Sequence, residues 1–212
     1  TNLAVDIKLP SNIVFTGEAI FGKDINAIKQ VNINEADPAG KMVGPDNRDF
    51  WTAQRVVSSV GNATVLTNTD EGYQYSLTAQ LTKGFTRGFS GMFAYTYSAA
   101  KDISNNPGSA AFSAYSSNSA VGSLNNPGLS YSNFSTPHQL IAHGSYRIEY
   151  AKILATTFTV AYRGFQQGRW SYTYSNDLNN DGISSDLMYI PKSENEITFV
   201  DYTSGGVTMT AA

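Results

Sequence analysis

Residues 73–82 read YQYSLTAQLT, and this stretch decides the fold because large apolar side chains alternate strictly with polar ones. Tyrosine, leucine and alanine occupy the odd positions, whereas glutamine, serine and threonine occupy the even ones. Successive side chains of a β-strand point to opposite faces, so a period of two gives a strand with one apolar and one polar face. An amphipathic helix would need a period of about 3.6 instead. The stretch therefore predicts a β-strand.

The same alternation recurs along the chain and predicts six strands. Their ranges are 3–9, 13–22, 73–83, 89–99, 138–150 and 153–164. Most of them are about as long as the roughly 9–11 residues with which a tilted strand crosses a bilayer.

The connections between these strands alternate between very short and very long. The short ones lie near residues 10–12, 84–88 and 151–152, and the long ones span 23–71, 100–137 and 165–212. Compact soluble domains mostly join their elements by about 4–6 residues. Outer-membrane barrels combine short turns on one side of the membrane with long loops on the other. We therefore predict an all-β fold, an antiparallel up-and-down meander that forms part of a large transmembrane β-barrel with long outer loops.

Alternation alone leaves a second architecture open. An antiparallel β-sandwich also buries every second residue, so its strands show the same pattern. Two further features favour the barrel, because barrels carry aromatic girdles at their interfaces and a polar inner face. The polar positions hold Gln, Thr, Ser and Glu, and tyrosines lie near strand ends at Tyr73, Tyr97, Tyr150 and Tyr162. The alternative is a soluble or surface β-sandwich that binds glycan or protein.

The composition narrows the function. Charged residues make up 15% of the chain, against roughly 25% in a typical soluble domain, so the sequence is poor in side chains for a water-facing surface. The net charge is −3 and the Lys and Arg residues are scattered singly, which argues against nucleic acid as a partner. The chain has no cysteine, and therefore neither a disulfide nor thiol catalysis. Neither a G-x-S-x-G elbow nor a glycine-rich phosphate loop occurs, and we expect no enzyme.

One local motif carries metal chemistry. Asp177, Asn179 and Asp181 alternate before a glycine, which matches the start of a calcium-binding loop whose glycine permits a sharp bend. Met188 stands at the twelfth position, where the EF-hand form has a carboxylate, and Asp186 at the tenth is the substitute oxygen donor in our hypothesis. We predict that Asp177, Asn179, Asp181 and Asp186 are the calcium ligands. The alternative is an ordinary turn, because Asn-Asp-Gly runs are common in turns.

Three stretches of the chain resemble a known family. Residues 9–28 read LPSNIVFTGEAIFGKDINAI, residues 136–140 read TPHQL, and residues 177–191 read DLNNDGISSDLMYIP. Together they resemble barrel segments of Oar-like TonB-dependent receptors, the carboxypeptidase-regulatory-like type that is common in Bacteroidetes.

The resemblance implies a receptor for nutrient uptake in the outer membrane of a Gram-negative bacterium. Such a receptor has a barrel of about 22 strands that is closed by a plug domain. Its implied partners are outer-membrane lipid, the TonB system acting through the plug domain, and an unknown nutrient. Six predicted strands do not close such a barrel, and the 212 residues show no plug and no TonB box, so we expect a segment of the barrel wall. No ligand-binding residue is assigned to this segment.

Overall fold

The computed structural model describes residues 1–150 and 152–210, and its regular structure is almost entirely β. Ala151, in the predicted short turn 151–152, and Ala211 and Ala212, in the predicted loop 165–212, lie outside the described residues. The chain, predicted from its sequence to be one segment over residues 1–212, divides into two compact units. The first comprises Thr1–Lys29, Leu66–Pro107 and Gly128–Trp170, and the second comprises Gln30–Val65, Gly108–Pro127 and Ser171–Ala212. No helix among the described residues is long and apolar enough to cross a membrane.

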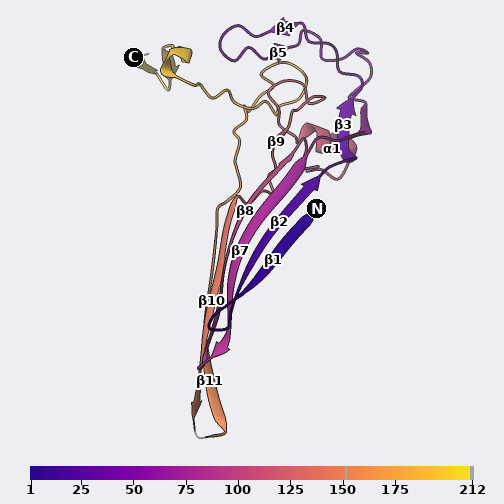
Figure 1. Ribbon diagram of the computed structural model, residues 1–212. Coiled ribbons are helices and arrows are strands. Elements are labelled where there is room, and N and C mark those ends of the chain that lie inside the picture. The colour runs from indigo at the N-terminus through magenta and orange to yellow at the C-terminus, as the bar shows by residue number, and fades with distance from the viewer. Residues whose placement is uncertain (151, 211–212) are drawn as a thin grey trace. The chain divides into compact units, whose positions relative to one another are not determined.

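The first unit is one large antiparallel sheet (Figure 1). Its strands are β1 (Asn2–Leu9), β2 (Ile13–Lys23), β7 (Tyr73–Thr86), β8 (Phe89–Asp102), β9 (Ser130–Tyr131), β10 (His138–Tyr150) and β11 (Leu154–Phe165). The six main strands lie in the order β1-β2-β7-β8-β10-β11, so each pairs with the next along a meander, and β9 pairs with the end of β8. The predicted all-β, antiparallel architecture is confirmed. Over the described residues the sheet is open, with β1 and β11 at its edges.

Short turns join the strands at one end of this sheet. Ser11 and Asn12, between β1 and β2, have φ values of 64° and 58°, and Arg87 and Gly88, between β7 and β8, have values of 52° and 80°. Pairs of left-handed residues suit hairpins because their twist matches that of the flanking strands. Since the strands run antiparallel in sequence order, the short connections share one end of the sheet. The long segments after β2, β8 and β11 leave it from the other end.

A β-bulge lengthens β7 beyond its predicted end. The register shifts between Lys83 and Thr86, where β7 holds one residue more than β8. A bulge reverses the alternation of side chains, so Phe85 lies on the polar face of the sheet. The predicted turn over residues 84–88 is too long because β7 continues through Thr86.

The segments predicted as long loops contain short elements of their own. In residues 23–71, β3 (Ala27–Asn32) pairs with β6 (Thr64–Thr69), and β4 (Gly40–Lys41) pairs with β5 (Asp49–Phe50). Residues 100–137 contain helix α1 (Ala111–Ser116) besides β9, and residues 165–212 contain the 3-10 helix η1 (Glu194–Glu196) and the hairpin of β12 (Tyr202–Ser204) and β13 (Val207–Met209). These elements are too short to leave a periodic signal in the sequence.

The second unit has a small apolar core. Tyr115, Ala120 and Leu124 are buried together, and Ile183 packs against them. Trp51 is 2% exposed, and its indole N–H donates to a backbone carbonyl oxygen at 2.7 Å. The predicted loops thus form a compact unit rather than separate excursions from the sheet.

Candidate lipid-facing surface and candidate calcium loop

One face of the large sheet is apolar from edge to edge. The register aligns one complete row across the six main strands, here named the apolar row: Ile7, Phe15, Leu81, Phe93, Ala142 and Tyr162. Directly opposed residues on one face of an antiparallel sheet have Cβ atoms about 4.5–5.5 Å apart, so such neighbours touch. The alternation in the sequence therefore becomes a continuous apolar surface in the fold.

This face is exposed. The exposed fractions in the apolar row include 44% for Leu81, 47% for Phe93 and 60% for Tyr162. The buried apolar residues of the described chain lie elsewhere: Trp51, Ala94, Ile103, Ala114, Tyr115, Ala120 and Leu124. Soluble monomers rarely expose contiguous apolar patches larger than a few hundred Å². The described residues therefore leave the apolar face of the sheet uncovered.

Aromatic side chains gather at both ends of the apolar face. At the loop end, the Tyr75 ring centroid lies 6.1 Å from that of Tyr97, which lies 5.3 Å from that of His138. At the turn end, Phe89 and Tyr146 are opposed across β8 and β10. The predicted girdle residues Tyr73, Tyr97 and Tyr162 lie toward the loop ends of their strands, and Tyr150 lies at the turn end. Aromatic residues at both borders of an apolar band are typical of a surface that meets two membrane interfaces.

The opposite face carries polar side chains that hydrogen-bond across strands. The hydroxyl oxygens of Thr78 and Thr96 lie 2.9 Å apart, and the Thr16 hydroxyl donates to the Asp6 carboxylate at 2.6 Å. Polar groups need such partners or water to be satisfied. This face therefore suits water or a polar partner.

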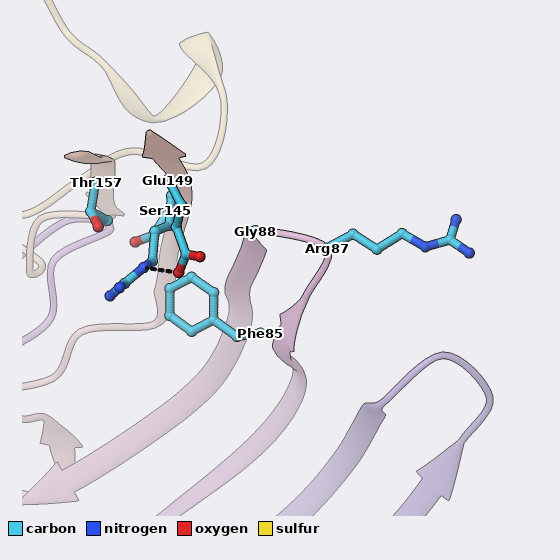
Figure 2. Close-up of a pocket in the computed structure, with 7 residues that line it drawn as sticks. Phe85, Arg87, Gly88, Ser145, Glu149 and Thr157 are labelled. Carbon is cyan, nitrogen blue, oxygen red and sulfur yellow. Dashed lines mark hydrogen bonds and ion pairs between the residues drawn. The ribbon is translucent and has the colours of Figure 1, made fainter. Parts of the chain in front are cut away.

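A pocket of about 730 Å³ opens at the turn end of the polar face (Figure 2). It is lined by Phe85, Arg87, Gly88, Ser145, Arg147, Glu149 and Thr157. Arg147 Nε donates to Glu149 Oε1 at 3.0 Å, the contact that is dashed in Figure 2, and Phe85 lines the same pocket. The pocket leaves no signal in the sequence, because Phe85 is predicted in a turn, whereas the β-bulge brings its ring onto this face. The pocket offers a ring, a cation and an anion to a polar partner.

In the second unit, the predicted calcium ligands come together in one loop. The carboxylate of Asp177 accepts hydrogen bonds from the backbone N–H of Asp181 at 3.1 Å and of Gly182 at 2.8 Å. The side-chain oxygen of Asn179 accepts from the N–H of Asp181, also at 3.1 Å. Gly182 has a φ of 94°, a conformation that glycine adopts readily. The loop thus folds tightly around the Asp177 carboxylate.

Asp186 joins this loop and is paired with a cation of the chain itself. Asp186 Oδ2 accepts from the N–H of Leu178 at 2.9 Å, and its Oδ1 lies 3.4 Å from Arg48 Nη1. The Arg48 and Asp186 side chains are only 1% and 2% exposed. Arg48 also donates to Asp46 at 2.9 Å and to the Leu187 carbonyl oxygen at 2.6 Å. A single arginine in a long loop carries no sequence signal that would have revealed this partner.

Carboxylates crowd the loop of residues 177–186, the candidate calcium loop. Burial raises the pKa of Asp181 to about 7, and the carboxylates of Asp177 and Asp186 add to this effect. Burial also raises the pKa of Asp186, although the Arg48 guanidinium opposes the shift. A divalent cation would favour the ionised forms. Among the described residues, no group of three or more His, Cys, Asp or Glu side chains is arranged to hold a metal ion, and calcium binding stays a prediction.

No family model, curated protein or solved structure matches the chain. The resemblance to TonB-dependent receptors consequently stands on its three sequence stretches alone. In the fold, residues 9–28 run from the end of β1 through β2 into β3, residues 136–140 lead into β10, and residues 177–191 contain the candidate calcium loop.

Proposed function

We propose that the chain is a segment of the wall of a transmembrane β-barrel. The observation that carries this proposal is the exposed apolar face, which crosses six antiparallel strands while the opposite face is polar. In a barrel wall every second residue faces lipid and its neighbours face the lumen. The apolar face then lies in hydrocarbon, and the polar face lies in the polar interior of the barrel. Strands within hydrocarbon have no free edges because the barrel closes. In this proposal further strands pair with β1 and β11.

The alternative is the soluble or surface β-sandwich that binds glycan or protein. A sandwich needs a second sheet packed about 10 Å from the first. The other sheets among the described residues are two-stranded: β3 with β6, β4 with β5, and β12 with β13. A two-stranded sheet is too narrow to cover a face of six strands, which favours the barrel.

Within this class, we propose a TonB-dependent receptor of the Oar-like type in the outer membrane of a Gram-negative bacterium. Support comes from the three resembling stretches and from short turns at one end of the sheet with long segments at the other. In this proposal the apolar face contacts outer-membrane lipid, and the polar face with its pocket contacts the plug domain. The TonB system acts through that plug to take up an unknown nutrient. The segment itself binds and positions; it does not catalyse.

Single cysteines test this proposal sharply, because the chain has none of its own. Leu77 and Thr78 are neighbours on β7 that project to opposite faces. We expect a fluorophore on the Leu77→Cys variant, refolded into phosphatidylcholine vesicles, to be quenched by brominated acyl chains. The same fluorophore on the matched Thr78→Cys variant stays bright, because that position faces away from hydrocarbon. Equal quenching at both positions, or none at either, overturns the proposal.

A further inference from the structure

A row of cations and tyrosines crosses the loop end of the apolar face. The register aligns Lys23 of β2, Tyr73 of β7, Lys101 of β8 and Tyr131 of β9. In β2, β7 and β8 these positions continue the alternation of the apolar residues, so they belong to the same face. The apolar face therefore ends, on this side, in a positively charged border.

Two positive side chains share the ring of Tyr131. Lys101 Nζ lies 4.8 Å from the ring centroid, and Arg169 Cζ lies 3.7 Å from the same centroid. Lys23 donates to the carbonyl oxygen of Asp70 nearby on the same border. An aromatic face attracts a cation, but two cations at one ring also repel each other. An anion that contacts both Lys101 and Arg169 would relieve that repulsion, and Tyr131 is 41% exposed, so the group is accessible.

Below the border, the chemistry changes in a fixed order along the strands. Lys101 is followed toward the turn end by the aromatic level of Tyr75 and Tyr97 and then by aliphatic positions such as Leu81. A membrane lipid has the same order of phosphate, interface and acyl chain. Asp102 directly follows Lys101 in β8. Its side chain therefore points to the opposite, polar face. The border is therefore positive on the side that carries the apolar residues.

We propose that Lys101 and Arg169, with Lys23 two strands away on the same border, bind the phosphate of an anionic membrane lipid whose acyl chains lie along the apolar face. This inference rests on the proposed lipid-facing function and names the lipid chemistry of that same surface. Lysine and arginine form strong charge-assisted hydrogen bonds with phosphate oxygens. A soluble anion would use the cations alone. A lipid also uses the apolar rows that continue directly from them, so charge complementarity and continuity both point to the lipid.

Vesicle flotation tests the inference with the whole 212-residue chain. The chain is refolded from urea with vesicles of phosphatidylcholine alone or of phosphatidylcholine with phosphatidic acid, and the floating fraction is measured. We expect a preference for phosphatidic acid that falls about tenfold or more in the Lys101→Gln/Arg169→Gln variant, because each cation near an anionic surface contributes about fivefold. The matched control is Lys83→Gln, which removes a single cation from the turn end of the same face and is expected to lower the preference by no more than about fivefold.

The outcomes separate this inference from the proposal beneath it. Equal flotation of the unaltered chain on both vesicles overturns the phosphate site and leaves the lipid-facing surface intact. Failure to float on either vesicle overturns the lipid-facing surface itself. Loss of the preference in millimolar inorganic phosphate assigns the cations to a soluble anion and also overturns the inference. If circular dichroism shows that the double variant does not refold, two other measurements test the inference. The single variant Lys101→Gln should weaken the preference for phosphatidic acid, and added salt should weaken the preference of the unaltered chain.

Discussion

The large sheet and the second unit distribute polar and apolar side chains in opposite ways. In the sheet, apolar side chains such as Leu81 and Phe93 are exposed. In the second unit, charged and amide side chains are buried: Arg48 is 3% exposed and Asn179 is 0% exposed. The described residues thus leave the apolar face of the sheet uncovered, whereas the second unit buries polar side chains that hydrogen-bond within it.

Asn34 illustrates how the second unit is ordered. Its side-chain Nδ2 lies 3.1, 3.0 and 3.0 Å from the carbonyl oxygens of Val57, Val60 and Gly61, so its two N–H groups serve three acceptors and one of them is shared. Its side-chain oxygen accepts from the N–H of Val57 at 2.8 Å. Backbone groups that are buried must find partners, and one asparagine here supplies what a neighbouring strand would supply in a sheet. Long segments with little regular structure can thus hold one conformation through polar side chains.

The largest loss of stability is expected when the buried cation Arg48 is removed from the second unit. Arg48→Met leaves Asp186 buried without its partner, and breaking a buried ion pair in this way costs about 3–5 kcal/mol. Urea unfolding followed by the emission of Trp51, in a Trp170→Phe background, measures the loss in the second unit. The exposed Arg55 gives the control, and Arg55→Met is expected to change stability by about 0.5 kcal/mol or less. Equal losses in the two variants would show that the second unit does not rest on its buried charges.

The second-largest loss of stability is expected for a charge placed on the apolar face of the sheet. Leu81→Arg places a charge in the middle of the proposed lipid face, where it weakens folding into vesicles by about 2–4 kcal/mol. Gln80→Arg places the same charge on the polar face and is expected to cost little. Urea titration of both variants in phosphatidylcholine vesicles measures the difference. Similar losses would mean that the two faces of the sheet do not meet different media.

The sequence could predict the sheet because its determinants are local and repeated. Alternation over the six predicted ranges needs only neighbouring residues to define two faces, and the register then follows from the short turns. The bulge that re-aims Phe85 interrupts that rule at one residue, so the pattern contains no trace of it.

The second unit could be predicted only in part. Asp177, Asn179 and Asp181 could be singled out because their alternation before a glycine is a local motif with fixed spacing, and their role as calcium ligands stays a prediction. Arg48, the partner of Asp186, lies 138 residues from it in the sequence, and nothing periodic links the two. Buried polar networks are built from such distant single residues, so one sequence does not reveal them.

A third prediction concerns the turn that closes the sheet next to the pocket. Gly88 has a φ of 80°, and a Cβ atom there would lie 2.6 Å from the Arg147 carbonyl oxygen. Gly88→Ala combines backbone strain with this clash and is expected to destabilise the sheet by about 1–3 kcal/mol. Gly144→Ala is the matched control, because its Cβ would meet its nearest neighbour at 3.9 Å. Urea titration in vesicles compares the stability of the two variants. A larger loss of stability for Gly144→Ala would show that the turn at Gly88 does not require a glycine more than the strand does.

A fourth prediction follows from the carboxylates of the calcium loop. Because the pKa of Asp181 is raised from 3.8 to about 7, the folded loop binds a proton that the unfolded chain has released between these two values. Stability of the second unit therefore falls as pH rises from 3.8 to about 7 and is lowest above that range. Asp181→Asn removes the contribution of Asp181 to this dependence. Hydrogen exchange of the loop amides across this range measures it.

Calcium should act on the same loop in the opposite sense. A bound divalent cation favours the ionised carboxylates, so it lowers the pKa of Asp181 and restores stability at neutral pH. Isothermal titration of the unaltered chain and of Asp181→Asn tests the binding. No heat at millimolar calcium would remove the calcium prediction while leaving the pH dependence in place.

The smallest effect is expected for Glu149→Gln on the polar face of the sheet. Arg147 and Glu149 are 50% and 73% exposed, and an exposed ion pair contributes only about 0.2–1 kcal/mol. In a receptor whose plug covers this face, the same substitution would leave Arg147 unpaired away from water, where the loss rises to about 3–5 kcal/mol. Urea titration of the variant in the chain alone and in a barrel with its plug compares the two settings. An equally small loss of stability in both settings would show that the plug does not cover the ion pair of Arg147 and Glu149. A larger loss in the barrel with its plug would show that a partner outside this segment covers the polar face.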